Sequence, residues 1–153
     1  MDIGSKHGYP ASALSNFAPH RFVYDDEESA SMEGFLQSLK FSNPEVARSV
    51  RQLVGLAAKK RGSKRNDAWQ RARCLWWKGE PVDRFGQAYQ DLLDGAFRAM
   101  FDQSDSARKA LLASGTATLT HSIGRRKKSE TILTTSEFCG RLTVIRNELQ
   151  RVA

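Results

Sequence analysis

The chain has 153 residues, of which 40% are hydrophobic and 27% charged, a composition typical of a soluble globular domain with a substantial core. Its formal net charge of +7 attracts phosphates on nucleotides or nucleic acid. No apolar run approaches the roughly 18 residues that cross a bilayer, and the N-terminus lacks the apolar core of a secretory signal. Cys74 and Cys139 stand alone, so we expect one cytoplasmic domain over residues 1–153 without a disulfide framework or zinc site.

The first 31 residues predict loops and one short strand. The LSNFAP stretch at 14–19 is typical of a turn-forming loop with two apolar anchors, Leu14 and Phe17. Residues 21–24 favour a strand, and the four acids at 25–28 favour a turn that complements the dipole of a following helix. Ser29 or Ser31 would cap that helix.

The next segment predicts an amphipathic helix with a second, polar stripe. Its apolar face consists of Met32, Phe35, Leu36 and Leu39. Glu33, Gln37 and Lys40 have helical spacing on a neighbouring stripe, which either lies in water or lines a cleft under another part of the chain. In water, Glu33 and Lys40 would form an ion pair worth roughly a few tenths of a kcal/mol. In a cleft, they would be close enough for proton transfer or covalent chemistry.

Helical periodicity continues through the middle of the chain. An Asn-Pro pair opens a helix over residues 43–57. The basic run at 59–65 predicts an exposed loop, and a further helix follows over 68–76 before the WKGEP turn. The two basic runs, 59–65 and 125–128, attract phosphates or simply solubilise loops. Both interpretations remain open.

The second half of the chain predicts three helices and two short strands. The helices cover residues 87–101, 104–112 and 134–149, the last opened by a Thr-x-x-Glu capping box. β-branched residues favour strands at 116–120 and 131–133. The sum is a mainly α single domain with a few short β-strands, with an α+β fold as the alternative.

Two motifs in the first 41 residues resemble the NADAR family, also called YbiA-like. They are the LSNF loop at 14–17 and the helix pattern S-x-E-x-x-x-Q-x-x-K-F at 31–41. LLASG at 111–115 and L-x-x-I-R-x-x-L at 142–149 also match family segments. Where members usually carry a Trp-Gly pair, this chain has HSIG at 121–124. The resemblance therefore implies a YbiA-like fold over nearly the whole chain and a divergent branch of the family.

The resemblance also implies an activity. Family members resemble N-glycosidases, so we expect cleavage of a ribose C1–N bond in a phosphorylated N-riboside. Candidate substrates are ADP-ribosylated guanine in nucleic acid and a ribosylaminopyrimidine. Glu33 would stabilise the oxocarbenium-like carbon or position water or the departing amine. Lys40 would hold a phosphate or ribose hydroxyl, or displace an exocyclic amine through an imine.

Further residues are candidate substrate contacts. Gln37 would orient the substrate, and Ser15 and Asn16 would contact ribose or phosphate beside a packing Phe17. Trp77 would stack on a base and His121 would shuttle a proton, although both also fit structural roles. The sequence has no glycine-rich nucleotide loop and no paired-histidine metal motif, so we expect neither a metal nor a cofactor.

Two other interpretations stay open. The chain would be a non-catalytic module that binds ADP-ribose or another nucleotide, or a nucleic-acid-binding protein that acts through its basic runs. No membrane partner is expected, and the oligomeric state is open.

Overall fold

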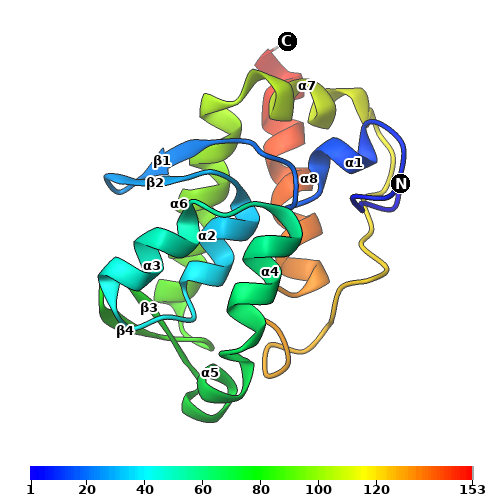
Figure 1. Ribbon diagram of the computed structural model, residues 1–153. Helices are drawn as coiled ribbons and strands as arrows, with labels where there is room; N and C mark the ends of the chain where they lie inside the picture. The colour runs from blue at the N-terminus through cyan, green and yellow to red at the C-terminus, as the bar shows by residue number, and fades with distance from the viewer. Residues whose placement is uncertain (153) are drawn as a thin grey trace.

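The structure is a computed structural model that describes residues 1–152. It contains a mainly helical fold with two small antiparallel sheets within those residues (Figure 1). The elements are α1 (Ala11–Leu14), β1 (Phe22–Tyr24), β2 (Glu27–Ser29), α2 (Met32–Ser38), α3 (Pro44–Arg51), α4 (Gly55–Ser63), α5 (Asn66–Ala72), β3 (Cys74–Trp77), β4 (Glu80–Asp83), α6 (Gln87–Gln103), α7 (Asp105–Ala113) and α8 (Thr135–Val152). The mainly α fold class is confirmed.

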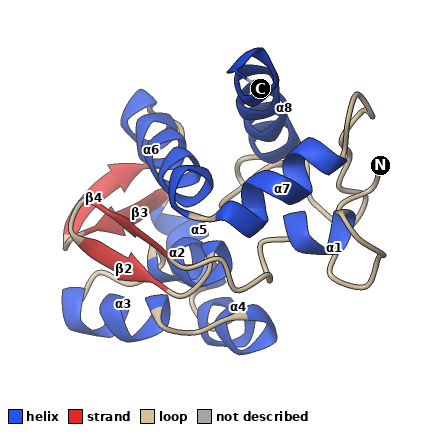
Figure 2. Cartoon of the chain, turned by 90° about the horizontal axis from the view of Figure 1, so that it is seen from above, coloured by secondary structure: helices blue, strands red, loops and turns tan. Residues whose placement is uncertain are grey.

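Helix α2 is the centre of the fold, because every one of its residues is buried. Helices α3, α4 and α6 and strand β2 all pack against it. Seen from above, the strands lie at one side of the molecule, while α1, α7 and α8 lie at the other (Figure 2). The apolar residues of α2 join the main core with α6, α7 and α8. The apolar face predicted for this helix is confirmed, and its polar stripe is buried as well.

Close packing fixes the start of α2. Ser31 is the N-cap, since its hydroxyl accepts a hydrogen bond from the Gly34 amide and donates one to the Leu53 carbonyl. A Cβ at Gly34 would lie 2.5 Å from the Leu53 carbonyl oxygen. The connection between α3 and α4 therefore rests directly on α2, and only glycine fits at the contact.

The helix predicted over 43–57 is two helices, and the loop predicted at 59–65 is wrong. The chain breaks after Arg51 and restarts at Gly55, which has a φ of +53°. Most of the basic run then lies in α4. The buried positions of α4 are Ala58 and Gly62. Their small side chains leave no pattern of large apolar residues that would mark a helix in the sequence.

The helix predicted over 68–76 is also shorter than expected. Helix α5 ends at Ala72, and Arg73 has a φ of 55°. The following residues form hairpin β3–β4, whose turn residues Lys78 and Gly79 have φ values of 51° and 83°. Two positive values are typical of a tight hairpin turn. The acidic turn at 25–28 is likewise partly strand, because Glu27 and Glu28 pair with β1.

The strands predicted at 116–120 and 131–133 are absent from the described residues, apart from a bridge between Asp2 and Thr120. Side chains replace a neighbouring strand at the second segment. The carbonyl of Thr131 accepts from Arg84 Nε at 3.0 Å, and that of Ile132 accepts from the Tyr89 hydroxyl at 2.6 Å. These bonds satisfy the backbone, so the segment needs no strand partner.

The strand at 21–24 and the helices predicted over 87–101, 104–112 and 134–149 are confirmed by β1, α6, α7 and α8. The capping box at the start of α8 is also present: Thr134 Oγ1 accepts from the Glu137 amide at 3.1 Å, and Glu137 Oε1 accepts from the Thr134 amide at 2.8 Å. None of the helices within residues 1–152 combines the length and hydropathy that a membrane crossing requires.

Candidate active site

The polar stripe of α2 lies under α4 and the start of α5. Glu33, Gln37 and Lys40 expose only 9%, 6% and 5% of their surface. Burial of this extent rules out an ordinary solvated helix face, in which all three side chains would be open to water. All three side chains are therefore covered by other parts of the chain, with Glu33 and Gln37 on α2 and Lys40 in the turn that directly follows it.

Neutral amides hold the two charged groups apart. Gln37 Nε2 donates to Glu33 Oε1 at 3.4 Å, while Lys40 Nζ donates to Asn66 Oδ1 at 2.6 Å. Asn66 is the first residue of α5, and its Oδ1 also accepts from Trp69 Nε1 at 3.4 Å. Within the described residues, no ion pair within 4.0 Å joins Glu33 to Lys40. The charges of the acid and the amine therefore shift each other's pKa, but the two groups form no direct ion pair.

Helix α4 closes the stripe at Gly62. A Cβ at Gly62 would lie 1.8 Å from Gln37 Oε1, so any larger residue would displace the amide. Gln37 Oε1 itself is buried and has no hydrogen-bond partner among residues 1–152. A buried, unpaired acceptor costs free energy, and it lies between the carboxylate and the amine in sequence.

Burial shifts both charged groups toward their neutral forms. Removal from water raises the pKa of Glu33, although the hydrogen bond from Gln37 and the charges of Lys40 and Lys59 act to lower it. Removal from water likewise lowers the pKa of Lys40 to about 8, with Glu33 acting to raise it and Lys59 to lower it further. At pH 7 about a tenth of such lysines are neutral, against less than roughly one in a thousand for a solvated lysine. A neutral amine is a nucleophile.

The LSNF loop lies on the N-terminal end of α2. The Asn16 carbonyl accepts from the Glu33 amide at 3.0 Å. Ser15 is buried, and its hydroxyl accepts from the Phe17 amide at 3.2 Å. The Phe17 ring packs against Gly55 at the start of α4, since a Cβ there would lie 3.7 Å from it. The structure thus brings Asn16 and Phe17 to the end of the Glu33 stripe, while the Ser15 hydroxyl supports the loop.

Trp77 lies on a different side of α2. Its ring packs 5.4 Å from that of Phe35 and 5.2 Å from the Arg51 guanidinium, and its Nε1 donates to Asp25 Oδ2 at 2.8 Å. Phe35 belongs to the core face rather than the polar stripe. The structure does not bring Trp77 to Glu33 through these contacts, and its role in stacking remains a prediction.

His121 lies beside the start of α8. Its Nδ1 is 2.8 Å from the Ile3 carbonyl oxygen, and its ring meets Phe138 edge-on at 5.3 Å. It also lines one of two concavities, of about 420 and 410 Å³, that lie along α8 and whose walls do not include the α2 stripe. These contacts place His121 away from Lys40, and its role as a proton shuttle remains a prediction.

The sequence did not indicate Lys59, Gly62 and Asn66 as individual parts of this face. In the sequence, Lys59 is one of several basic residues in a run. The packing of Gln37 against Gly62 has no sequence pattern that would reveal it. Asn66 lies 26 positions after Lys40. Its contact with Lys40 follows from the turn between α4 and α5, which single-sequence periodicity does not reveal.

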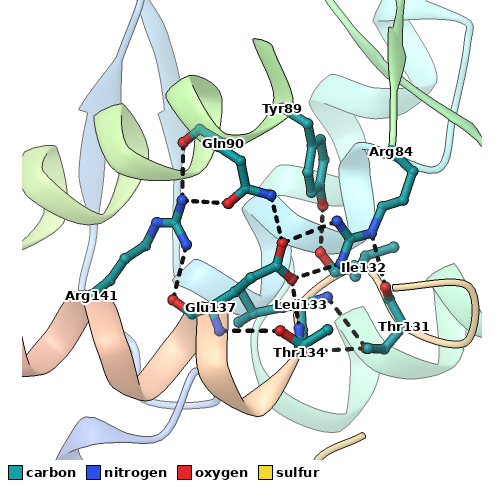
Figure 3. Close-up of polar contacts among 9 residues, drawn as sticks. All are labelled: Arg84, Tyr89, Gln90, Thr131, Ile132, Leu133, Thr134, Glu137 and Arg141. Atoms are coloured by element: carbon teal, nitrogen blue, oxygen red, sulfur yellow. Dashed lines mark hydrogen bonds and ion pairs between the residues drawn. The ribbon is translucent and has the colours of Figure 1, made fainter. Parts of the chain in front are cut away.

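A second buried polar cluster surrounds Glu137 (Figure 3). The Arg84 guanidinium is fully buried and donates to both carboxylate oxygens of Glu137, at 3.1 and 2.6 Å. Gln90 Nε2 adds a bond of 2.7 Å, and the Thr134 amide adds the capping bond. Burial acts to raise the pKa of Glu137, but the bonds from Arg84, Gln90 and Thr134 outweigh it and hold the pKa below its ordinary value. This cluster joins the segment between β4 and α6 to both α6 and α8.

Three comparisons identify similar proteins. The family model for bacteriophage protein GP30.3 matches residues 8–147. An uncharacterized 17.1 kDa protein of the Gp30–rIII intergenic region of Enterobacteria phage T4 is 38% identical over 150 residues, covering 97% of this chain and 98% of that protein. The NMR structure of the E. coli protein YbiA matches with a TM-score of 0.62 and 17% identity, over 98% of this chain and 84% of that one. The fold is therefore YbiA-like, as the motifs implied, and the chain belongs to the bacteriophage protein GP30.3 family.

Proposed function

We propose that the chain is a divergent member of the NADAR family and an N-glycosidase that cleaves the ribose C1–N bond of a phosphorylated N-riboside at the Glu33–Lys40 face. The observation that supports this most is the burial of an acid on α2 and an amine in the turn after it, without an ion pair between them. Such an arrangement costs stability. Displaced pKa values of both groups are typical of residues used in chemistry.

Glu33 acts on the carbon and nitrogen of the bond that breaks. As the C1–N bond lengthens, positive charge develops on C1 and negative charge on the departing nitrogen. The carboxylate stabilises C1 or positions the attacking water, and the protonated form positions or protonates the departing amine. Burial raises the pKa of Glu33, which favours the protonated form that this second role requires.

Lys40 has two alternative roles. As an ammonium, it holds a phosphate or a ribose hydroxyl. As a neutral amine, it attacks C1 of the opened sugar and displaces the exocyclic amine, which leaves with a proton. Water then hydrolyses the resulting imine and releases the sugar. The pKa of about 8 supports the second role, because it supplies neutral amine near pH 7.

Substrate enters beside Lys59 in this proposal. Lys59 is exposed, and its charge acts on both Glu33 and Lys40. A phosphate bound at Lys59 would place the attached ribose next to the two buried groups. Gln37 Oε1, which lacks a partner, would then accept a hydrogen bond from a ribose hydroxyl.

Two variants test the chemistry. Glu33→Gln and Lys40→Ala should each lower cleavage of ADP-ribosylated oligonucleotides or ribosylaminopyrimidine phosphates by about 10²–10⁴-fold. Glu45→Gln, on the exposed first turn of α3, is the matched control and should keep full activity. Circular dichroism confirms folding of each variant. Full activity of both site variants on a substrate that the wild type cleaves would contradict the mechanism.

Borohydride trapping separates the two roles of Lys40. Reduction of an imine leaves a stable sugar adduct on Lys40, which peptide mass spectrometry would locate. Turnover without any adduct assigns the point-charge role instead.

A non-catalytic nucleotide-binding module is the second candidate, and the basic segments at 59–65 and 125–128 favour it. Calorimetry with ADP-ribose distinguishes the two functions. Stoichiometric binding without turnover of any N-riboside in a small panel would favour the binding module.

A further inference from the structure

The segments that follow the two basic runs, far apart in the sequence, touch in the structure. Gln70 Nε2 of α5 donates to the Glu130 carbonyl oxygen at 3.3 Å, a contact across 60 positions. Figure 1 shows the loop before α8 beside α5 and the lower end of α4. Residues 59–73 and 125–130 therefore form one surface, which we name the basic surface.

Most of the charge of the protein lies on this surface. Its two segments contain eleven Lys and Arg residues against two acids, Asp67 and Glu130, for a net charge of +9. Since the whole chain carries +7, the remaining residues together carry −2. The positive charge is a local feature, not an average over the molecule.

The cations of the basic surface are largely unpaired. Of its eleven Lys and Arg residues, only Arg125 has an acid within 4.0 Å among residues 1–152, which is Glu130 at 3.8 Å. Elsewhere arginines are matched with acids, as in Arg98 with Glu148 and Arg141 with Asp94 at 2.7 Å each. Cations without intramolecular partners are free to meet the phosphates of a ligand.

The basic surface borders the candidate active site. Lys59, at its edge, acts electrostatically on Glu33 and Lys40. Asn66, within it, accepts the hydrogen bond of Lys40. A phosphate chain on this surface would therefore run past Lys59 and Asn66, which are the neighbours of Glu33 and Lys40.

We propose that the basic surface binds the sugar–phosphate backbone of a nucleic acid. This binding does not depend on the proposed function. A free nucleotide presents its phosphates at one point and needs few cations. A strand presents a charge about every 3.4 Å, which matches cations spread over two helices and a loop.

A membrane surface fits the same residues less well. Peripheral membrane binding combines cations with apolar side chains that enter the lipid. The large hydrophobic side chains that are exposed among the described residues all lie outside 59–73 and 125–130. The exposed hydrophobic side chains nearest to it, Leu56, Phe85 and Ile123, lie one each in three separate segments, so they form no continuous apolar face like that of a membrane-binding helix.

Two triple variants of equal charge test this surface. Lys60→Gln, Lys64→Gln and Lys127→Gln neutralise exposed cations within it, and Arg21→Gln, Lys109→Gln and Arg151→Gln neutralise exposed cations outside it. Affinity for fluorescein-labelled 20-mers of single- and double-stranded DNA and of RNA is measured by anisotropy at several salt concentrations. The first triple should bind about 10–100-fold more weakly at 0.1 M salt, with a salt slope smaller by about 2–3. The second should change affinity by less than about two-fold.

Three results would overturn the proposal: no binding of any 20-mer by the wild type, equal weakening by both triples, or binding only to vesicles that contain phosphatidylserine. Glu33→Gln keeps this test separate from that of the proposed function, because it should bind the 20-mers like the wild type while losing cleavage. If the first triple binds like the wild type and N-riboside cleavage persists, the surface assignment fails and the proposed function stands.

Discussion

The Arg84–Glu137 cluster and the Glu33–Lys40 face are both buried, and each contains one acid and one base, but their hydrogen bonding differs. Arg84 contacts Glu137 at two oxygens, and Gln90 and the Thr134 amide complete the shell of the carboxylate. Glu33 instead receives one long bond from an amide, and Lys40 binds a different residue. The pKa of Glu137 is lowered, whereas burial raises that of Glu33.

This difference separates a structural pair from a chemical one. A buried charge with a complete set of partners is fixed in its ionised form and holds elements together. A buried charge with incomplete partners lies near a change of protonation, which is what proton transfer or nucleophilic attack requires. The comparison supports a structural role for the first cluster and the proposed chemical role for the second.

Breaking the structural pair should have the largest effect on stability. Arg84→Met leaves Glu137 buried and unpaired, so we expect a loss of about 3–5 kcal/mol in the free energy of unfolding. Urea denaturation measures it. The double variant Arg84→Met, Glu137→Leu should recover much of the loss, because it removes the orphaned charge. A loss below about 1 kcal/mol in the single variant would contradict the structural role.

The same type of substitution at the chemical pair should act in the opposite direction. Lys40→Met removes a charge that burial disfavours, so we expect a gain of about 1–3 kcal/mol at pH 7 together with loss of activity. For a domain of this size each kcal/mol raises Tm by about 2–4 °C. Lys59→Met, at an exposed position, should change stability by less than about 0.5 kcal/mol. A clear fall in Tm for Lys40→Met would count against the assignment.

Gly62 tests how tightly α4 closes the site. Gly62→Ala places a Cβ against Gln37, so we expect a loss of about 1–3 kcal/mol and a lower rate of cleavage. Gly140→Ala is the matched control, since no atom lies within 4 Å of its added Cβ in helix α8. That variant should gain about 0.5–1 kcal/mol from helix propensity. Equal effects of both substitutions would show that the Gln37 contact is unimportant.

The pH dependence of stability gives the most specific effect, because it isolates the contribution of Lys40. The pKa of Lys40 is about 8 when folded, against 10.5 ordinarily, so the unfolded chain binds more protons between these values. Stability of the wild type should therefore gain from Lys40 as pH rises from 8 to 10.5, at up to about 1.4 kcal/mol per pH unit. The advantage of Lys40→Met should be full below pH 8 and disappear above 10.5. An advantage that is constant with pH would exclude this cause.

The sequence contained the essential pattern of the site but not its surroundings. The spacing of Glu33, Gln37 and Lys40 predicted a shared stripe, and the LSNF and S-x-E motifs indicated a YbiA-like fold, which the structure confirms. The stripe is covered because α4 packs against it, and the buried residues of α4 are Ala58 and Gly62. Small residues at a helix contact leave no periodic signal, so the cover was visible only in three dimensions.

The Arg84–Glu137 cluster shows the same limit. The capping box of Thr134 and Glu137 was recognised from four residues, because capping is local. The partner of Glu137 lies 53 positions earlier, in a segment with no distinctive pattern. Side-chain bonds from Arg84 and Tyr89 to the backbone at 131–132 also replaced the strand that β-branched residues had predicted. Long-range bonds of this kind override local propensity.

The central claim is that burial lowers the pKa of Lys40, because its ammonium group has one hydrogen-bond partner among residues 1–152, Asn66, and no ion pair with Glu33. Titration of the ¹³C-labelled lysine side chains by NMR, with Lys40→Arg to assign the signal, tests it without a substrate. The account predicts one lysine with a pKa of about 8, which rises when Lys59→Gln removes the neighbouring cation. A Lys40 signal that titrates near 10.5 like the surface lysines would contradict it.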